Sequence, residues 1–206
     1  MFGAANPPQT ESTPFYPRSP YAAAKVYAYW MSINFREAYN MFISNGILFN
    51  HESPLRGLEF VTRKISNEVA KISLGLSKKL ELGNILAKRD WGYAPEYVEG
   101  IWKSLQIKNP DDYILATNES HSVKEFVEKA CQIAGVSTKC LKITKSNLRP
   151  FDVNHLKGDY SKAKRKLGWK PKTKFNDLVK IMVEEDIHRW EQRLKGEYLP
   201  WDAGNS

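Results

Sequence analysis

The chain has 206 residues, of which 42% are hydrophobic, 26% charged and 12% aromatic. This composition excludes a disordered chain, because there is enough apolar surface to offset the entropy lost on folding, and the length allows one or two domains. No run of about 18 apolar residues predicts a transmembrane helix. The N-terminus lacks the basic flank and apolar stretch of a signal peptide. Two cysteines without a C-x-x-C pair favour a reduced, cytoplasmic setting.

The net charge of +8 is unevenly distributed. Between Lys142 and Lys180 there are twelve Lys and Arg residues against three Asp, so the rest of the chain is close to neutral. Such a segment binds nucleic acid or a polyphosphate ligand, or is simply a solvated face. A nucleic-acid-binding module is the weaker interpretation, because the segment lacks interleaved aromatic residues and any recognition motif.

The first half of the chain predicts a loop followed by helices and short strands. Five prolines in the first twenty residues predict the loop. Residues 21–40 predict a long helix and residues 41–49 a buried strand. Apolar residues at helical spacing predict a second helix over residues 60–74, and residues 79–82 a short strand.

The second half continues this alternation. We expect helices over residues 95–105, 161–167 and 175–195, and strands over residues 113–116 and 140–143. Ser122 and Glu125 follow the capping-box pattern, which predicts a helix from there to about Ala134. Helices that alternate with short strands indicate an α/β protein. None of the twelve glycines forms the G-x-G-x-x-G turn of a dinucleotide-binding half.

Tyr21 and Lys25 are four residues apart, so on a helix they share one face. A free tyrosine has a pKa near ~10 and is a poor base at neutral pH. A nearby ammonium stabilises the phenolate and lowers that pKa, and it can also bind a ribose hydroxyl. The spacing alone is weak evidence, because it occurs often by chance and is more often that of an ordinary surface pair.

The sequence around this pair resembles the GDP-mannose 4,6-dehydratases, which are extended short-chain dehydrogenase/reductases. The resemblance covers essentially the whole chain. It rests on the segments PFYPRSPYAAAK (14–25), NFREAYN (34–40), NGILFNHESP (45–54), FVTRKI (60–65), LGN (82–84), AKRDWG (87–92), His121 to Val123, Glu125-Phe126 and Arg149-Pro150.

The resemblance implies an incomplete NAD(P)-binding Rossmann sheet, made of its C-terminal strands and helices, with a smaller C-terminal α/β substrate lobe. Residues 1–58 correspond to the remaining part of the Rossmann domain, and residues 59–206 mainly to the substrate lobe with returning Rossmann segments. Family members begin with a Gly-rich half that has no counterpart in this chain. We therefore expect a truncated enzyme that is inactive alone.

The resemblance also implies the reaction and its cofactor. GDP-mannose loses water to give GDP-4-keto-6-deoxymannose through an internal hydride transfer with bound NADP. Tyr21 matches the residue that removes the proton from O4 of mannose, and Lys25 matches the lysine that lowers the tyrosine pKa and holds the nicotinamide ribose. The Glu that removes the C5 proton and the Ser/Thr that helps O6 leave have no counterpart here.

The remaining site residues are expected to bind ligands. His51 matches a position beside the cofactor, although a lone His after a buried strand is more often structural. Arg56 matches an arginine that contacts NADP across a subunit interface, where the family usually has two adjacent arginines and this chain has Leu55-Arg56. The contacts expected for GDP-mannose are Asn50, Lys64, Arg89 and Arg149, because guanidinium groups bind phosphate oxygens in pairs.

The partners expected are therefore GDP-mannose and a second copy or the missing N-terminal half, with no metal, nucleic acid or membrane. One alternative is a non-catalytic remnant that associates with a full-length dehydratase. The other is the basic nucleic-acid-binding module.

Overall fold

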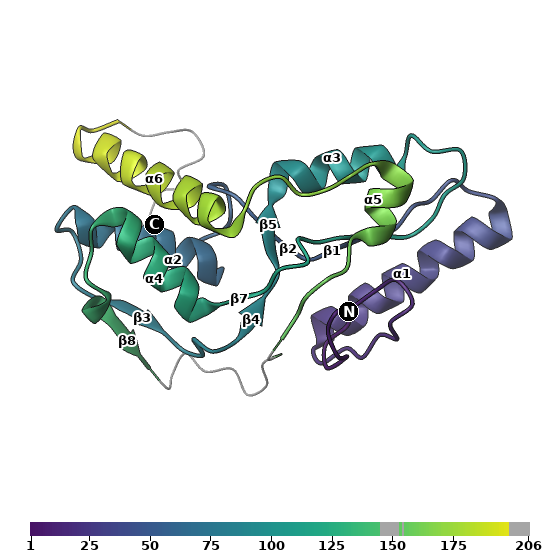
Figure 1. Ribbon diagram of the computed structural model, residues 1–206, viewed down its shortest axis with the longest axis horizontal. Helices are drawn as coiled ribbons and strands as arrows, with labels where there is room; N and C mark the ends of the chain where they lie inside the picture. Colours follow the sequence, from purple (N-terminus) through teal and green to yellow (C-terminus); the bar gives the residue numbers. More distant parts are fainter. Residues whose placement is uncertain (145–152, 154, 198–206) are drawn as a thin grey trace. The chain divides into compact units, whose positions relative to one another are not determined.

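The computed structural model describes residues 1–144, 153 and 155–197 (Figure 1). It divides into two compact units, each built from three chain segments. Unit 1 contains Met1–His51, Ala87–His121 and Pro150–Thr173, and unit 2 contains Glu52–Leu86, Ser122–Arg149 and Lys174–Ser206. Among the described residues, no helix is both long and apolar enough to cross a membrane.

Unit 1 is organised around two parallel strands. β1 (Gly46–Leu48) pairs with β6 (Tyr113–Leu115), in a register that places Gly46 opposite Tyr113. Two further pairs of strands are β2 (Asn50–Glu52) with β5 (Trp91–Tyr93) and β4 (Lys88–Arg89) with β7 (His121–Ser122). The division between the units falls at the last residue of β2 and of β7.

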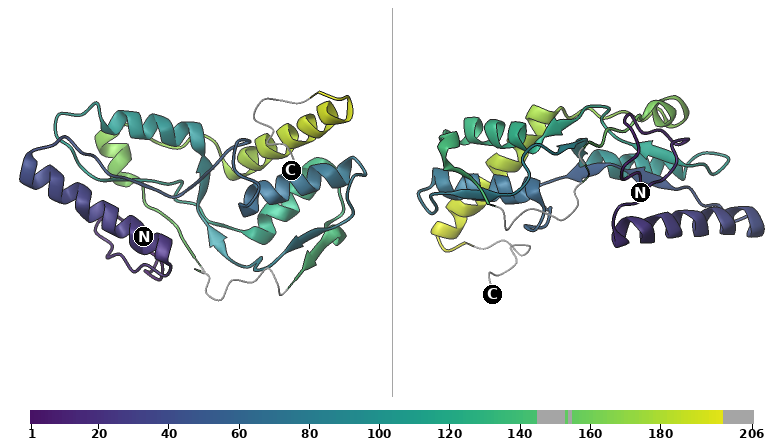
Figure 2. Two further views of the ribbon diagram at one scale, coloured as in Figure 1. Left: turned by 180° about the vertical axis from the view of Figure 1, so that it is seen from behind. Right: turned by 90° about the horizontal axis from the view of Figure 1, so that it is seen from below.

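The two faces of β6 pack against different apolar clusters, because successive side chains of a strand point to opposite faces. Ile114 packs in a cluster with Phe2, Ile47, Phe49 and Ala116. Tyr113 and Leu115 pack in another with Tyr97, Ala163 and Trp169. The second cluster includes residues of α3 (Ala94–Ser104) and of α5 (Ser161–Leu167), a short helix that lies next to one end of α3 (Figures 1 and 2).

The long helix α1 (Pro20–Tyr39) also belongs to unit 1. It begins with Ser19, whose hydroxyl accepts a hydrogen bond from the Ala22 N–H, and Pro20 occupies the first turn, where no N–H is needed. The helix ends at Asn40, which has a left-handed conformation. No residue of α1 is buried, and the aromatic side chains of Tyr27, Trp30 and Tyr39 are exposed.

Unit 2 is a packed group of three helices with a two-stranded parallel sheet. The helices are α2 (Val61–Ser73), α4 (Val123–Ala134) and α6 (Phe175–Leu194), and they contact one another pairwise. The strands β3 (Leu80–Leu82) and β8 (Leu141–Ile143) pair, and the 3₁₀ helix η1 (Thr138–Cys140) precedes β8. The core is formed by one face of each helix: Ile65, Val69 and Ala70; Phe126, Val127 and Ala130; Leu178, Val179, Met182 and Val183.

The structure confirms the predicted helices to within one residue at each end, and the capping box of α4. The Ser122 hydroxyl accepts from the Glu125 N–H at 3.1 Å, and the Ser122 N–H donates to the Glu125 carboxylate at 2.6 Å. The alternation of helices and strands confirms the α/β class.

The buried strand predicted over residues 41–49 is wrong in length, because only Gly46–Leu48 pair with β6. Met41 and Phe42 are 49% and 46% exposed. Before β1, polar contacts with side chains replace a strand ladder. The Ile43 carbonyl accepts from the Arg36 guanidinium at 3.1 Å, and the Ser44 hydroxyl donates to the Ser104 carbonyl at 3.0 Å. The two- and three-residue strands β2, β4, β5 and β7 were not predicted.

Candidate active site

Tyr21 and Lys25 lie in the first two turns of α1 and form a pair. The Lys25 Nζ is 5.6 Å from the centroid of the Tyr21 ring. The Tyr21 side chain is 72% exposed, and Lys25 is exposed as well. The N-cap at Ser19 fixes the start of the helix and therefore the direction of both side chains. The pair presents a phenol and an ammonium to solvent from one helix face.

Asn50 and His51 lie together in β2, just after the buried Phe49. The His51 Nδ1 donates to the Phe49 carbonyl at 2.9 Å, which leaves Nε2 unprotonated in the neutral ring. The imidazole stacks on the Tyr97 ring, with centroids 5.4 Å apart and an interplanar angle of 27°. These two contacts fix the ring plane of His51 in unit 1.

Arg89 lies in β4, and its Nη1 donates to two backbone carbonyls. The acceptors are Lys88, at 2.9 Å, and Val153, at 2.5 Å. These bonds orient a half-buried guanidinium group in unit 1. The other predicted phosphate ligand, Arg149, lies outside the described residues.

Asp90, the neighbour of Arg89, is fully buried and connects three parts of unit 1. Its carboxylate accepts hydrogen bonds from the N–H and hydroxyl of Thr117, at 2.8 and 2.7 Å, and from the N–H groups of Asn118 and Gly158, both at 3.1 Å. Burial raises the pKa of Asp90 to about 6 although these donors favour the carboxylate. Asp90 therefore joins the residues that follow β6 and the Gly158 segment to the end of β4.

Arg56 and Lys64 lie in unit 2. The Arg56 guanidinium is 3.6 Å from the centroid of the Phe60 ring, and its Nε is 3.4 Å from Oε2 of the buried Glu52. Thr62 donates to the same Glu52 oxygen at 2.6 Å. Lys64 is half-buried in the first turn of α2. Unit 2 thus presents one arginine and one lysine of the predicted set.

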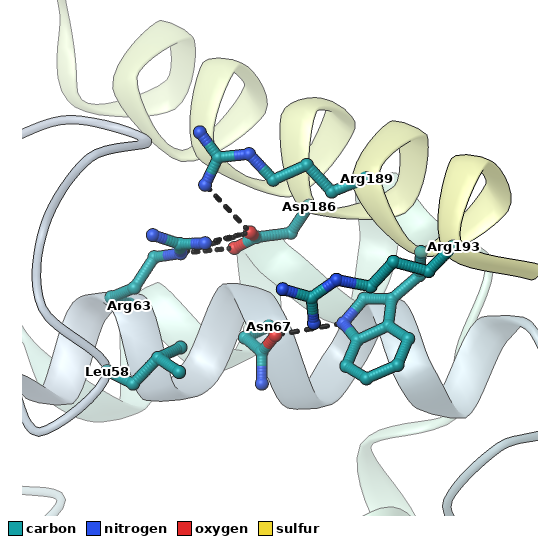
Figure 3. A pocket seen from close by; sticks show the side chains of 7 residues that line it. Leu58, Arg63, Asn67, Asp186, Arg189 and Arg193 are labelled. Carbon is teal, nitrogen blue, oxygen red and sulfur yellow. Dashed lines mark hydrogen bonds and ion pairs between the residues drawn. The ribbon is translucent and has the colours of Figure 1, made fainter. Parts of the chain in front are cut away.

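A small pocket in unit 2 lies between α2 and α6 (Figure 3). Its empty volume is about 220 Å³, part of which is open solvent. The buried Asp186 carboxylate pairs with the Arg63 guanidinium at 2.8 Å and accepts from the Ser66 hydroxyl at 2.6 Å. Burial raises the pKa of Asp186 despite these partners. The pocket is lined by Leu58, Arg63, Asn67, Asp186, Arg189, Trp190 and Arg193.

The structure therefore brings together Tyr21 with Lys25, and Asn50 with His51. Sequence reasoning missed the buried charges Asp90, Arg63 and Asp186. For the last two a sequence pattern existed. Asp186 continues the spacing of the buried face of α6, three residues after Val183, and Arg63 lies on the face of α2 that contains Ser66 and Ala70. A charge on an apolar helix face indicates a buried pair.

The fold is shared with solved structures of other proteins. The structure titled RMD from Pseudomonas aeruginosa, complexed with NADPH, superposes with a TM-score of 0.80 at 20% identity, covering 89% of this chain and 61% of that chain. dTDP-glucose 4,6-dehydratase from Bacillus anthracis, in complex with NAD, gives a TM-score of 0.80 at 21% identity, covering 98% and 61%. These superpositions show that the chain is an α/β protein with the fold of these two structures, and they confirm the expected fold class.

The sequence comparisons identify the family. The profile of the GDP-mannose 4,6 dehydratase family matches residues 1–182. GDP-mannose 4,6 dehydratase 1 of Arabidopsis thaliana is 54% identical over 205 residues, which are 99% of this chain and 56% of that protein. This chain belongs to the GDP-mannose 4,6-dehydratase family, as the resemblance implied, and it spans little more than half the length of the relatives that it matches.

Proposed function

We propose that this chain supplies the Tyr-x-x-x-Lys helix and the substrate lobe of a GDP-mannose 4,6-dehydratase, and that it is inactive without a Gly-rich half. The observation that carries the proposal is the exposed Tyr21–Lys25 pair in a chain 54% identical to a relative named for this activity. In this proposal, residues 1–58 are the remaining part of the Rossmann domain. Residues 59–206 are mainly the substrate lobe and include the segments in which the chain returns to the Rossmann domain.

The side chains of α1 fit the nicotinamide end of a dinucleotide. A phenol and an ammonium on one exposed face can both donate to ribose hydroxyls. Arg56 adds a cation for a phosphate group of NADP, and His51 contributes a ring with fixed orientation. The chain has no Gly-rich turn to hold the pyrophosphate.

Tyr21 acts as the base in the proposed reaction. It removes the proton from O4 of mannose, while Lys25 stabilises the phenolate and binds the ribose. Bound NADP would supply the redox chemistry, as acceptor and then donor of one hydride, and the residues that would hold it are Tyr21, Lys25, His51 and Arg56. The groups that remove the C5 proton and assist the loss of water come from outside this chain.

GDP-mannose binding is assigned to Asn50, Lys64, Arg89 and Arg149. The diphosphate needs cations and planar donors, and guanidinium groups give two parallel bonds to phosphate oxygens. The two carbonyls that Arg89 contacts support this assignment, because they hold its guanidinium in one orientation. Asn50 contributes an amide that can bind the sugar.

A partner that completes the sheet is also part of the proposal. Among the described residues, β1 pairs with β6 alone, so its other edge has no strand partner. The exposed aromatic residues of α1 add apolar surface in the same unit. Both features support association with an N-terminal half or with a second copy.

The proposal is tested with a chimera that joins the N-terminal part of the Arabidopsis relative to Met1 of this chain. We expect the chimera to convert GDP-mannose to the 4-keto product, measured by its absorbance in alkali, and the 206-residue chain alone to form none. Tyr21→Phe should lower the rate of the chimera at least ~10²-fold, because it removes the base.

The matched control is Tyr27→Phe, which removes the hydroxyl of another exposed tyrosine of α1. It should leave the rate unchanged. Turnover by the 206-residue chain alone, or full activity of the Tyr21→Phe chimera, would contradict the proposal.

A further inference from the structure

The loop of residues 53–57, between β2 and α2, carries Arg56. Within the loop, the Arg56 N–H donates to the Ser53 carbonyl at 3.0 Å and the Leu55 N–H donates to the Ser53 hydroxyl at 3.1 Å. The loop belongs to neither β2 nor α2, so its carbonyl groups are not bound within a strand pair or a helix. The two local bonds do not involve the carbonyls of Pro54 and Arg56. Other contacts must fix its position.

Two buried arginines from different helices bind these carbonyls. The Pro54 carbonyl accepts from Nη1 of Arg63, on α2, at 2.5 Å and from Nη1 of Arg189, on α6, at 2.6 Å. The Arg56 carbonyl accepts from Nη1 of Arg63 at 3.0 Å. Hydrogen bonds from a charged donor are stronger than neutral ones, so two helices of unit 2 hold this loop.

The guanidinium groups of Arg63 and Arg189, which bind the loop, also face the Asp186 carboxylate (Figure 3). The Arg63 Nε donates to both Asp186 oxygens at 3.0 Å, and Arg63 Nη2 is 2.8 Å from Oδ1. The Arg189 Nη1 is 3.9 Å from Oδ1. All three side chains are buried, and a buried guanidinium requires a charged partner in a defined geometry.

The side chain of Arg56 is held as well as its backbone. Glu52 and Phe60 contact the guanidinium, and the side chain is 23% exposed. We infer that Asp186, acting through Arg63 and Arg189, is a positioning residue that holds the loop so that Arg56 meets a phosphate group of the nicotinamide dinucleotide. This inference rests on the proposed function only for the ligand of Arg56.

The first test is amide hydrogen exchange by mass spectrometry on the 206-residue chain. Arg189→Lys keeps a positive charge beside Asp186 but loses the planar fork that reaches the Pro54 carbonyl. We expect exchange of residues 55–60 to become about tenfold faster, with α4 unchanged. Arg193→Lys is the matched control, because Arg193 lies on the same helix and packs on Trp190 in the same pocket. It should leave the loop unchanged.

The second test is NADPH affinity in the chimera, by fluorescence titration. Arg189→Lys should raise the Kd about tenfold when Arg56 is present and leave it nearly unchanged in the Arg56→Ala background. A purely structural role would weaken binding in both backgrounds. GDP affinity should not change.

Asp186→Asn gives a second check of the same loop, because it leaves the Arg63 guanidinium without its carboxylate, whereas Arg189 keeps Glu185, whose Oε1 is 3.3 Å from the Arg189 Nε. It should accelerate exchange of residues 55–60 further than Arg189→Lys does. Unchanged exchange in both variants overturns the loop contact. If exchange becomes faster but Arg189→Lys and Arg56→Ala have additive effects on the free energy of NADPH binding, the positioning role is overturned. A chimera that binds no NADPH overturns the proposed function and the cofactor role of Arg56, while the exchange data still decide whether Asp186 holds the loop.

Discussion

Arg36 and Asp112 form a bidentate ion pair in unit 1. The Arg36 Nη1 donates to Oδ1 at 2.8 Å and Nη2 to Oδ2 at 3.2 Å. The same carboxylate accepts from the Tyr29 hydroxyl at 2.9 Å and from the Asn45 amide at 2.8 Å. Because α1 has no buried residue, this polar cluster contributes much of what attaches the helix that carries Tyr21 and Lys25 to the start of β6.

The charge of Asp112 should therefore be important for the stability of unit 1. Burial acts to raise its pKa, but the hydrogen bonds from Arg36, Asn45 and Tyr29 outweigh burial, so the pKa lies below its ordinary value. The Asp112 carboxylate therefore stabilises the fold at pH values above the pKa that Asp112 has in the unfolded chain. This stabilisation is lost as the pH falls through the lower pKa of Asp112 in the folded chain. Asp112→Asn should cost about 3 kcal/mol at pH 7, because it leaves Arg36 without its partner. Urea unfolding followed by tryptophan fluorescence measures this cost.

Glu37→Gln is the control for Asp112→Asn. It removes one negative charge from the exposed face of the same region of unit 1 and should change the free energy of unfolding by less than about 0.5 kcal/mol. Equal effects of the two substitutions would mean that net charge, and not the Arg36 pair, explains the result.

Asp90 should make stability fall as the pH rises through weakly acidic values. Burial raises its pKa in the folded state from 3.8 to about 6, so folding favours the protonated form. The contribution is fully present below pH ~4 and is lost as the pH rises through about 6, with a total of about 3 kcal/mol. Carboxyl-carbon NMR should give a titration midpoint for Asp90 near 6. A midpoint below 4 would show that the hydrogen bonds from Thr117, Asn118 and Gly158 outweigh burial.

Gly92→Ala should disturb the stacking of His51. A Cβ at Gly92 would overlap the ring of Tyr97, on which His51 stacks. Overpacking of this kind costs about 1–3 kcal/mol, and the ring must move. We expect a lower melting temperature and a shifted His51 imidazole resonance. Gly46→Ala, in β1, is the control, because its new methyl group would meet the end of the Leu48 side chain at 3.0 Å and the Ile101 side chain at an ordinary contact distance of 3.9 Å.

The 206-residue chain alone should bind NADP weakly or not at all. Lys25 and Arg56 supply cations, but the chain contains no Gly-rich turn at a helix N-terminus to bind the pyrophosphate. Isothermal titration calorimetry of the chain with NADP should give no measurable heat at micromolar concentrations, whereas the chimera should bind. Micromolar affinity of the chain alone would contradict this expectation.

The helices were predictable because their patterns are local. The apolar spacing of α2 and the capping box of α4 are formed by residues within a few positions of one another, and the structure confirms both. The structure also confirms the predicted strands β3, β6 and β8 to within one residue at each end. The strands β2, β4, β5 and β7 were not predicted. β4, for example, has two residues and depends on pairing with β7, about thirty positions away. The strand expected over residues 41–49 is shorter in the structure. Its first half forms no ladder, and the Ile43 carbonyl in that half accepts from the Arg36 guanidinium instead.

The sequence by itself determined the family, the α/β class, and the positions of Tyr21 and Lys25 on one helix face, because motifs and helical periodicity are properties of neighbouring residues. The tertiary structure alone decided which charges are buried together. Arg63 and Asp186 are separated by more than one hundred residues, and so are Gln9 and Lys157, whose backbone and side-chain contacts join the N-terminal loop to the Gly158 segment. Such pairs form because a buried polar group needs a hydrogen-bonding or charged partner. The partner comes from a segment that is distant in the sequence, so local sequence patterns do not specify it.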